Sequence, residues 1–199
     1  MTERYRLRGP EELDDAQRAL YDAIANGPRK SQAAVVPIVD AEGRLLGPFG
    51  PMTIAPVVGD AVQAVGAALR FGTTMTARSK EAAILLVAAR RRCGYEWVLH
   101  EAAAVAAGIG PEALRALGAG TTPAGLGAET DAVLAIVDRL LDAGALSDAE
   151  YETGIGALGE RIVAELVWLV GYYAMLALAL AVFDPPLGGE ARPPWKEER

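Results

Sequence analysis

Apolar residues recur at helical spacing in almost every segment of this chain of 199 residues, and this pattern limits the fold more than any other feature. A half-buried strand needs strict alternation instead, and only residues 31–56 lack a helical stripe. Within them, residues 35–39 form a candidate short strand, followed by a turn at residues 40–43. We therefore expect an all-α fold. The expected helices, separated by Gly and Pro, span residues 11–26, 60–71, 74–92, 95–107, 111–117, 129–143, 147–158 and 160–183.

Local signals refine two of these helices and one of the loops. Thr76 is expected to cap the helix that follows it, and Ser147 with Glu150 three residues later matches a capping box. Residues 47–52 have the sequence Gly-Pro-Phe-Gly-Pro-Met and are expected to form a stiff loop. Loops of this kind line pockets in some proteins and simply route the chain in others.

The last expected helix contains a run of 18 residues without a charge, residues 166–183, which reaches the length of a membrane span. Glu165 precedes the run, Asp184 and two prolines close it, and no cluster of Lys or Arg flanks it. A helix buried in the core or between subunits is therefore favoured over a membrane span. Since no apolar run follows the charged first eight residues, we expect no signal peptide and a cytoplasmic protein.

Composition excludes several classes of function. With 19 Lys and Arg against 26 Asp and Glu, the net charge of −7 argues against nucleic acid and anionic membranes as partners. One Cys and one His exclude an intrachain disulfide, a four-Cys zinc site and a site built from several His, so no metal site is expected. The length fits a single domain over residues 1–184, with a tail at residues 185–199 that is rich in Pro, Gly and charge.

The single Cys and the single His lie in one polar stripe. Cys93, Glu96, Trp97 and His100 are spaced i, i+3, i+4 and i+7, which places them on one face of a helix. Glu96 can then hydrogen-bond His100, fix its tautomer and leave the other ring nitrogen free for proton transfer. Cys93 would lie at the helix N-terminus, where the dipole lowers the pKa of a thiol. The alternative is that the stripe consists of core residues with satisfied polar groups.

Glu81, in the preceding helix, leads directly into an apolar run. A carboxylate in this place either faces inward with a raised pKa or stays solvated near the start of the helix. Both interpretations are open from the residues alone.

The order Glu81, Cys93, His100 resembles the signature of the carboxymuconolactone decarboxylase family, which includes the alkylhydroperoxidase D-like proteins. Glu81 ends the run Arg-Ser-Lys-Glu, and residues 95–100 resemble the decarboxylase-like branch; the matching core spans residues 47–110. The resemblance implies a compact bundle of several helices that associates into homo-oligomers, trimers or hexamers, with the site near a subunit interface.

One position departs from the peroxidase branch of that family. Its members carry Cys-x-x-Cys, and here Glu96 stands in the place of the second Cys. With a single Cys in the chain, a sulfenic acid at Cys93 has no intramolecular resolving partner. The resemblance therefore favours the cofactor-free acid–base branch.

The first hypothesis is a lyase that decarboxylates, or shifts a proton in, a small lactone or unsaturated carboxylic acid. His100 would be the proton donor or shuttle, Glu96 would orient it, and Glu81 would be a second acid–base group. Arg70 is the candidate anchor for a substrate carboxylate, because its planar guanidinium suits one. The further substrate-binding candidates are Trp97, Phe49 and Tyr95.

Two other hypotheses remain. Cys93 could serve a one-cysteine peroxidase or redox protein with peroxiredoxin-type activity, which needs an accessible thiolate. The chain could also be a non-catalytic, ligand-binding member of the fold, because fold resemblance alone does not determine function.

Overall fold

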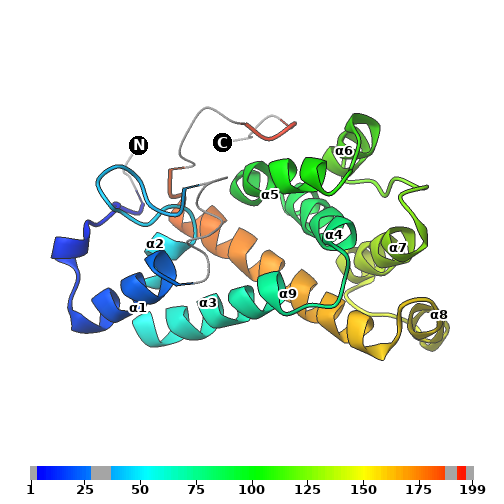
Figure 1. Ribbon diagram of the computed structural model, residues 1–199, viewed down its shortest axis with the longest axis horizontal. Helices are drawn as coiled ribbons and strands as arrows, with labels where there is room; N and C mark the ends of the chain where they lie inside the picture. The colour runs from blue at the N-terminus through cyan, green and yellow to red at the C-terminus, as the bar shows by residue number, and fades with distance from the viewer. Residues whose placement is uncertain (1–3, 28–36, 187–191, 196–199) are drawn as a thin grey trace. The chain divides into compact units, whose positions relative to one another are not determined.

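The computed structural model describes residues 4–27, 37–186 and 192–195, and within these ranges the regular structure is entirely helical (Figure 1). The all-α prediction is confirmed for this part of the chain. The first two residues of the candidate strand at residues 35–39 lie outside the described residues. Val39 makes only an isolated antiparallel bridge to Leu45 across the expected turn, where the Gly43 amide donates to the Asp40 carbonyl at 3.1 Å.

The chain forms two compact units. Unit 1 contains Met1–Gly72 and Leu178–Glu190, and unit 2 contains Thr73–Ala177 and Ala191–Arg199. The expectation of a single domain over residues 1–184 stays a prediction.

The described residues of unit 1 before Gly72 form the short 3₁₀ turn η1 (Pro10–Glu12) and the helices α1 (Asp15–Ala25), α2 (Phe49–Met52) and α3 (Pro56–Phe71). The expected helix at residues 11–26 is interrupted because Asp14 caps α1, accepting a hydrogen bond from the Gln17 amide at 2.9 Å. Residues 47–52 were expected to be a stiff loop. Instead, the last four form the helical turn α2, which is buried and packs against α3.

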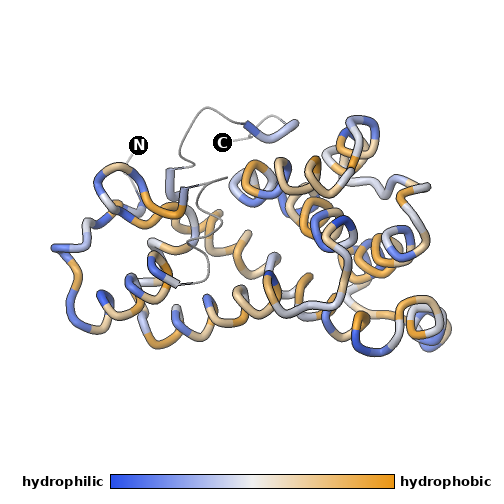
Figure 2. Tube along the Cα trace, viewed as in Figure 1, coloured by the Kyte–Doolittle hydropathy of each residue, from blue (hydrophilic) through white to orange (hydrophobic). Residues whose placement is uncertain are grey.

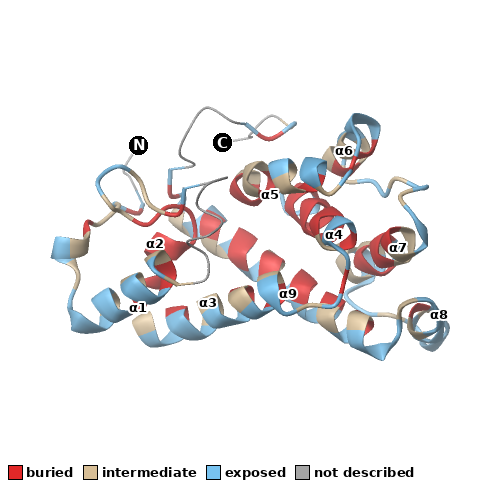
Figure 3. Cartoon of the chain, in the orientation of Figure 1, coloured by how far each residue is buried: buried red, intermediate tan, exposed pale blue. Residues whose placement is uncertain are grey.

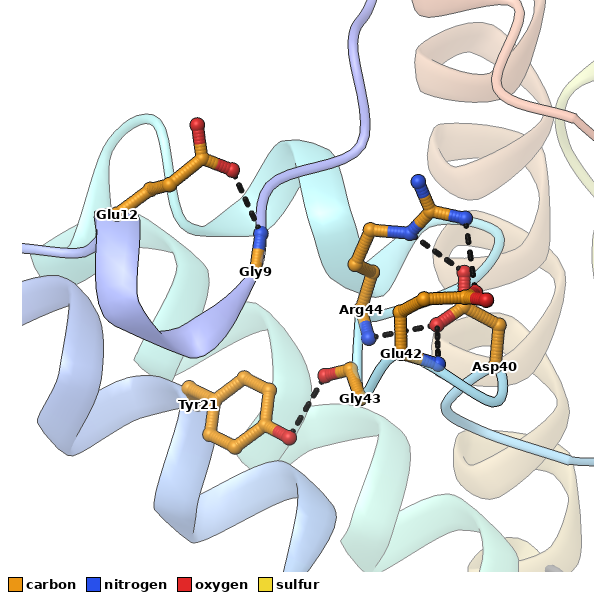
Figure 4. Close-up of polar contacts among 7 residues, drawn as sticks. All are labelled: Gly9, Glu12, Tyr21, Asp40, Glu42, Gly43 and Arg44. Carbon is orange, nitrogen blue, oxygen red and sulfur yellow. Dashed lines mark hydrogen bonds and ion pairs between the residues drawn. The ribbon is translucent and has the colours of Figure 1, made fainter.

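Polar contacts within unit 1 hold residues 40–44, which lie between α1 and α2 (Figure 4). The Asp40 carboxylate accepts from the backbone amide and from Nε of Arg44, at 2.8 and 2.7 Å. The Tyr21 hydroxyl on α1 donates to the Gly43 carbonyl at 2.7 Å. Gly43 has a positive φ of 76°, a conformation in which glycine avoids the strain of a side chain. These bonds order the turn without a sheet.

Unit 2 is built around α4 (Ala77–Arg90), which packs against three other helices. Almost every residue of α4 from Ser79 to Ala89 is buried (Figure 3). The Thr76 hydroxyl accepts from the Ser79 amide and caps α4, as predicted. The helices in contact with α4 are α5 (Gly94–Ala106), α6 (Pro111–Gly118) and α7 (Ala128–Ala143). The last of these packs against α8 (Asp148–Leu158), where the predicted capping box of Ser147 and Glu150 is present.

The final helix, α9 (Glu160–Phe183), has the predicted bounds. Residues up to Ala177 belong to unit 2, and the remainder belongs to unit 1. Although the helix is apolar along almost its whole length (Figure 2), only 44% of its most apolar 18-residue window is buried. By length and composition α9 also satisfies the requirements of a membrane span, which is weak evidence because core helices of soluble proteins satisfy them too.

Candidate active site

The core of unit 2 encloses a cluster of polar side chains from three helices. His100 and Glu96 lie on α5, Glu81 on α4 and Tyr173 on α9. Their exposed fractions are 2% for His100 and Glu96, 5% for Glu81 and 4% for Tyr173. A buried polar group destabilises the fold unless it is hydrogen-bonded, so the partners of His100 decide the chemistry of the cluster.

On one side of the ring, Nδ1 of His100 lies 2.6 Å from Oε2 of Glu81. This short contact between an imidazole and a carboxylate is a charge-assisted hydrogen bond, in which Nδ1–H donates and the carboxylate accepts. Of the two interpretations that were open for Glu81, the structure supports the inward-facing one. The orienting role that the spacing predicted for Glu96 falls to Glu81, because α4 brings it to the ring from the adjacent helix.

The other ring nitrogen, Nε2, meets weaker partners. The Tyr173 hydroxyl lies 3.4 Å away, and the two rings are edge to face with centroids 5.4 Å apart. Oε2 of Glu96 lies 3.5 Å from Nε2, which is longer than a good hydrogen bond. A neutral His100 with its proton on Nδ1 satisfies the contacts to Glu81 and Tyr173, since Tyr173 then donates to Nε2, whereas Nε2 and an ionised Glu96 carboxylate face each other as two acceptors. Nε2 is therefore the more weakly held end of the ring.

Two polar atoms of the same helix turn lack a partner. Within the part of the chain that the structure describes, Oε1 of Glu96 and Nε1 of Trp97 are buried and make no hydrogen bond. Leaving a buried donor or acceptor unpaired costs about 1–3 kcal/mol. An unpaired carboxylate oxygen beside the weakly held end of His100 is what a site would show if a ligand or water completed it.

Cys93 has a different environment. It is the N-cap of α5, but its side chain makes no cap hydrogen bond and is only 6% exposed. Burial, with a smaller contribution from the negative charge of Glu96, raises the pKa of the thiol to about 12. The expectation that the helix dipole lowers this pKa is wrong, because desolvation of a buried thiolate outweighs the dipole and the backbone amides.

The four predicted substrate-binding residues divide between the two units. Trp97 and Tyr95 lie on α5 in unit 2 and are 1% and 6% exposed. Phe49, on α2, and Arg70, in the last turn of α3, belong to unit 1. Phe49 is buried, and Arg70 is half-buried. The participation of these two residues in the site of unit 2 stays a prediction.

Sequence reasoning missed Tyr173. The residue lies 73 positions from His100, beyond the reach of any local spacing argument. A signal for it existed in the pair Tyr172 and Tyr173, whose two hydroxyls interrupt the aliphatic run of α9. A buried Tyr usually finds a partner for its hydroxyl, so this pair pointed to a polar contact in the core.

The cluster does not extend into a metal site in the described ranges 4–27, 37–186 and 192–195. Within them, no three side chains of His, Cys, Asp or Glu converge in a way that could hold a metal ion.

These features define an all-helical domain with a buried Glu–His pair on two adjacent helices. Comparison with protein families then gives a closer assignment. Residues 56–139 match the Carboxymuconolactone decarboxylase family, so the chain carries a domain of this family. The match includes Glu81, Cys93, Glu96 and His100, and it ends before Tyr173. No curated protein matches the chain.

Proposed function

We propose that this protein is a cofactor-free acid–base enzyme that decarboxylates, or shifts a proton in, a small lactone or unsaturated carboxylic acid. The observation that carries the proposal is the 2.6 Å contact between Glu81 and Nδ1 of His100 in the core of a domain of this family. A carboxylate on one ring nitrogen makes the other nitrogen a better base and stabilises the imidazolium once it forms.

The chemistry requires a proton at carbon. When the C–COO⁻ bond breaks, CO₂ leaves and the electron pair remains on the substrate as a dienolate. Nε2 of the neutral resting ring takes up a proton from solvent before this step and delivers it to carbon, and the ring returns to the neutral imidazole. Glu81 stabilises the charged ring while it holds that proton. Oε1 of Glu96, which has no partner among the described residues, is the candidate atom for contact with substrate.

The test is turnover of carboxymuconolactone in D₂O. We expect release of CO₂ and incorporation of deuterium at the carbon that lost it. His100→Gln keeps a polar group of similar length but cannot shuttle a proton, and we expect kcat to fall by roughly 10²–10⁴-fold. Gly156→Ala is the matched control, since a methyl group there meets no atom within 4 Å. Undiminished turnover by His100→Gln would refute the assignment, and wild-type protein inert toward lactones and unsaturated acids alike would favour a non-catalytic binding protein.

The peroxidase hypothesis is disfavoured by the state of Cys93. A thiol peroxidase needs a thiolate with access to its oxidant, whereas this thiol is 6% exposed and its pKa is raised to about 12. Because this pKa lies roughly 5 pH units above neutral pH, only about one such thiol in 10⁵ would be ionised there.

We also propose that the protein acts as a homo-oligomer joined through α9. One face of this helix carries large apolar side chains that remain exposed in the single chain, among them Trp168 at 69% and Leu178 at 67%. Trp168, Met175 and Val182 recur every seven residues, which is the spacing of a helix–helix seam. A contiguous exposed apolar face usually marks an interaction surface.

A charge on that face tests the association. We expect Trp168→Glu to lower the mass measured by size-exclusion chromatography with light scattering. Tyr151→Glu on α8 is the control, because Tyr151 is also an exposed large side chain, at 43%, but lies on a different helix. An unchanged mass for Trp168→Glu, or monomeric wild-type protein, would contradict the proposal.

A further inference from the structure

The described residues of the C-terminus, 192–195, lie against the helix that carries His100. The ring of Trp195 meets the ring of Trp97 edge to face, with centroids 5.3 Å apart and an interplanar angle of 76°. Pro193 is buried, whereas Trp195 remains half-exposed. We call residues 192–195 the C-terminal cap, because Trp97 beneath them is only 1% exposed.

Gly118, the last residue of α6, makes room for this arrangement. A Cβ at this position would lie 2.7 Å from Cγ of Pro194 and 3.3 Å from Cη2 of Trp97. The first distance is shorter than real Cβ contacts, so any side chain here would push the proline away. The requirement is steric, and it couples three segments: the end of α6, the cap and the indole of Trp97.

The cap lies against Trp97 without giving its indole N–H a hydrogen-bond partner. Nε1 of Trp97 is buried and has no partner in the described ranges, so the closed arrangement keeps an indole N–H away from both water and protein acceptors. Lifting the cap would expose the ring and allow this N–H to bond water. The recovered hydrogen bond offsets part of the lost aromatic contact, which brings the closed and open arrangements closer in free energy.

The position of Trp97 explains why such an opening matters. Trp97 follows Glu96 directly and lies three residues before His100, and both of these side chains are 2% exposed. A substrate can reach them only if part of their surroundings moves. Residues 192–195 lie outside the described helices and contact α5 at Trp97 and α6 at Gly118, so they can move without any helix unfolding.

We propose that residues 192–195 form a detachable cap over Trp97, and that release of this cap opens the face of α5 that carries Glu96 and His100. The inference rests on the proposed function in one respect: a catalytic site at Glu96 and His100 must open to admit its substrate. Its test reads the burial of Trp97 and needs no substrate, so it can fail or succeed independently of the decarboxylase assignment.

The test uses tryptophan fluorescence of the full chain, which contains three tryptophans. Trp168→Phe together with Trp195→Phe leaves Trp97 as the single reporter and keeps an aromatic ring in the cap. Adding Gly118→Ala should displace the cap, and we expect the acrylamide quenching constant of Trp97 to rise several-fold with a red shift of its emission. The control adds Gly156→Ala to the same background, and we expect no change because that helical glycine faces open space.

Circular dichroism during thermal unfolding decides whether the cap is separate from the core. If the cap is detachable, Gly118→Ala keeps the helical signal and the unfolding midpoint falls only slightly. If that variant does not fold, Trp168→Phe with Trp195→Ala serves in its place, since it removes the cap ring without touching α6. Unchanged quenching in a folded Gly118→Ala reporter, or loss of the fold in both variants, would overturn the proposal.

Discussion

The two ends of α5 bury polar groups in opposite ways. His100, in the second half of the helix, has a carboxylate from α4 on one nitrogen and a hydroxyl from α9 near the other. Cys93, at the N-terminal cap, is buried with a carboxylate nearby, and the pKa of its thiol is raised to about 12. The sequence spacing predicted both Cys93 and His100 as site residues. In the structure, only the imidazole of His100 has partners that stabilise its charged form. The comparison points to proton transfer at His100 and argues against thiolate chemistry at Cys93.

The largest expected effect on stability comes from removing Glu81, the carboxylate partner of His100. We expect Glu81→Ala to lower the free energy of unfolding by about 1.5–3 kcal/mol, the worth of a hydrogen bond to a charged group, as measured by urea denaturation. Glu81→Gln retains an acceptor for Nδ1–H and should lose less. Equal stability of wild type and Glu81→Ala would mean that the Glu81–His100 contact contributes nothing to the fold.

Removing the Tyr173 hydroxyl, the weaker partner of His100, should lower the stability by less. Tyr173→Phe removes the hydroxyl 3.4 Å from Nε2 and should lower the free energy of unfolding by about 0.5–1.5 kcal/mol. Because His100 is the single histidine of the chain, its ¹⁵N resonances need no assignment. We expect the Nδ1–H tautomer in wild-type protein, with a shift at Nε2 and little change at Nδ1 in the variant. A wild-type spectrum with the proton on Nε2 would contradict the arrangement.

The buried thiol of Cys93, at the N-terminal end of α5, predicts that the stability of the fold depends on pH in the alkaline range. Burial raises the pKa of Cys93 from 9.0 to about 12, so between these values the unfolded chain loses the thiol proton while the folded chain keeps it. Wild-type stability should therefore fall over this pH range by more than that of Cys93→Ala, in urea denaturation at matched pH. Below pH 9 the two proteins should respond to pH alike, and the folded thiol should resist alkylation. Rapid alkylation of folded protein at neutral pH would restore the thiolate hypothesis.

Several features were predictable from local sequence alone. The bounds of α9, the Thr76 cap of α4 and the capping box at Ser147 agree with the structure, because each depends on residues within one or two turns. The interruption before α1 was missed, although Asp14 and Gln17 form a capping box there too. The buried turn α2 was also missed, since its prolines and glycine suggested a loop, and packing against α3 outweighed that preference.

The candidate site could be predicted only in part. The spacing along α5 placed Glu96 and His100 together, but a carboxylate one turn away on the same helix reaches only 3.5 Å from Nε2. The shorter contact comes from Glu81 across a helix–helix interface, and the hydroxyl of Tyr173 comes from α9. Both contacts depend on how the helices pack: the Tyr172–Tyr173 pair suggested a polar contact in the core, but no local pattern named His100 as the partner.

The sequence by itself determined the helical class, the order of the helices and the candidates Glu81, Glu96 and His100, because periodicity, caps and residue types are local properties. Only the tertiary structure decided which of those residues act together. Packing of α4 on α5 brought Glu81 to His100, packing of α9 added Tyr173, and burial raised the pKa of the Cys93 thiol. The physical reason is that both the distance between charges and their desolvation are set by neighbours far away in the chain.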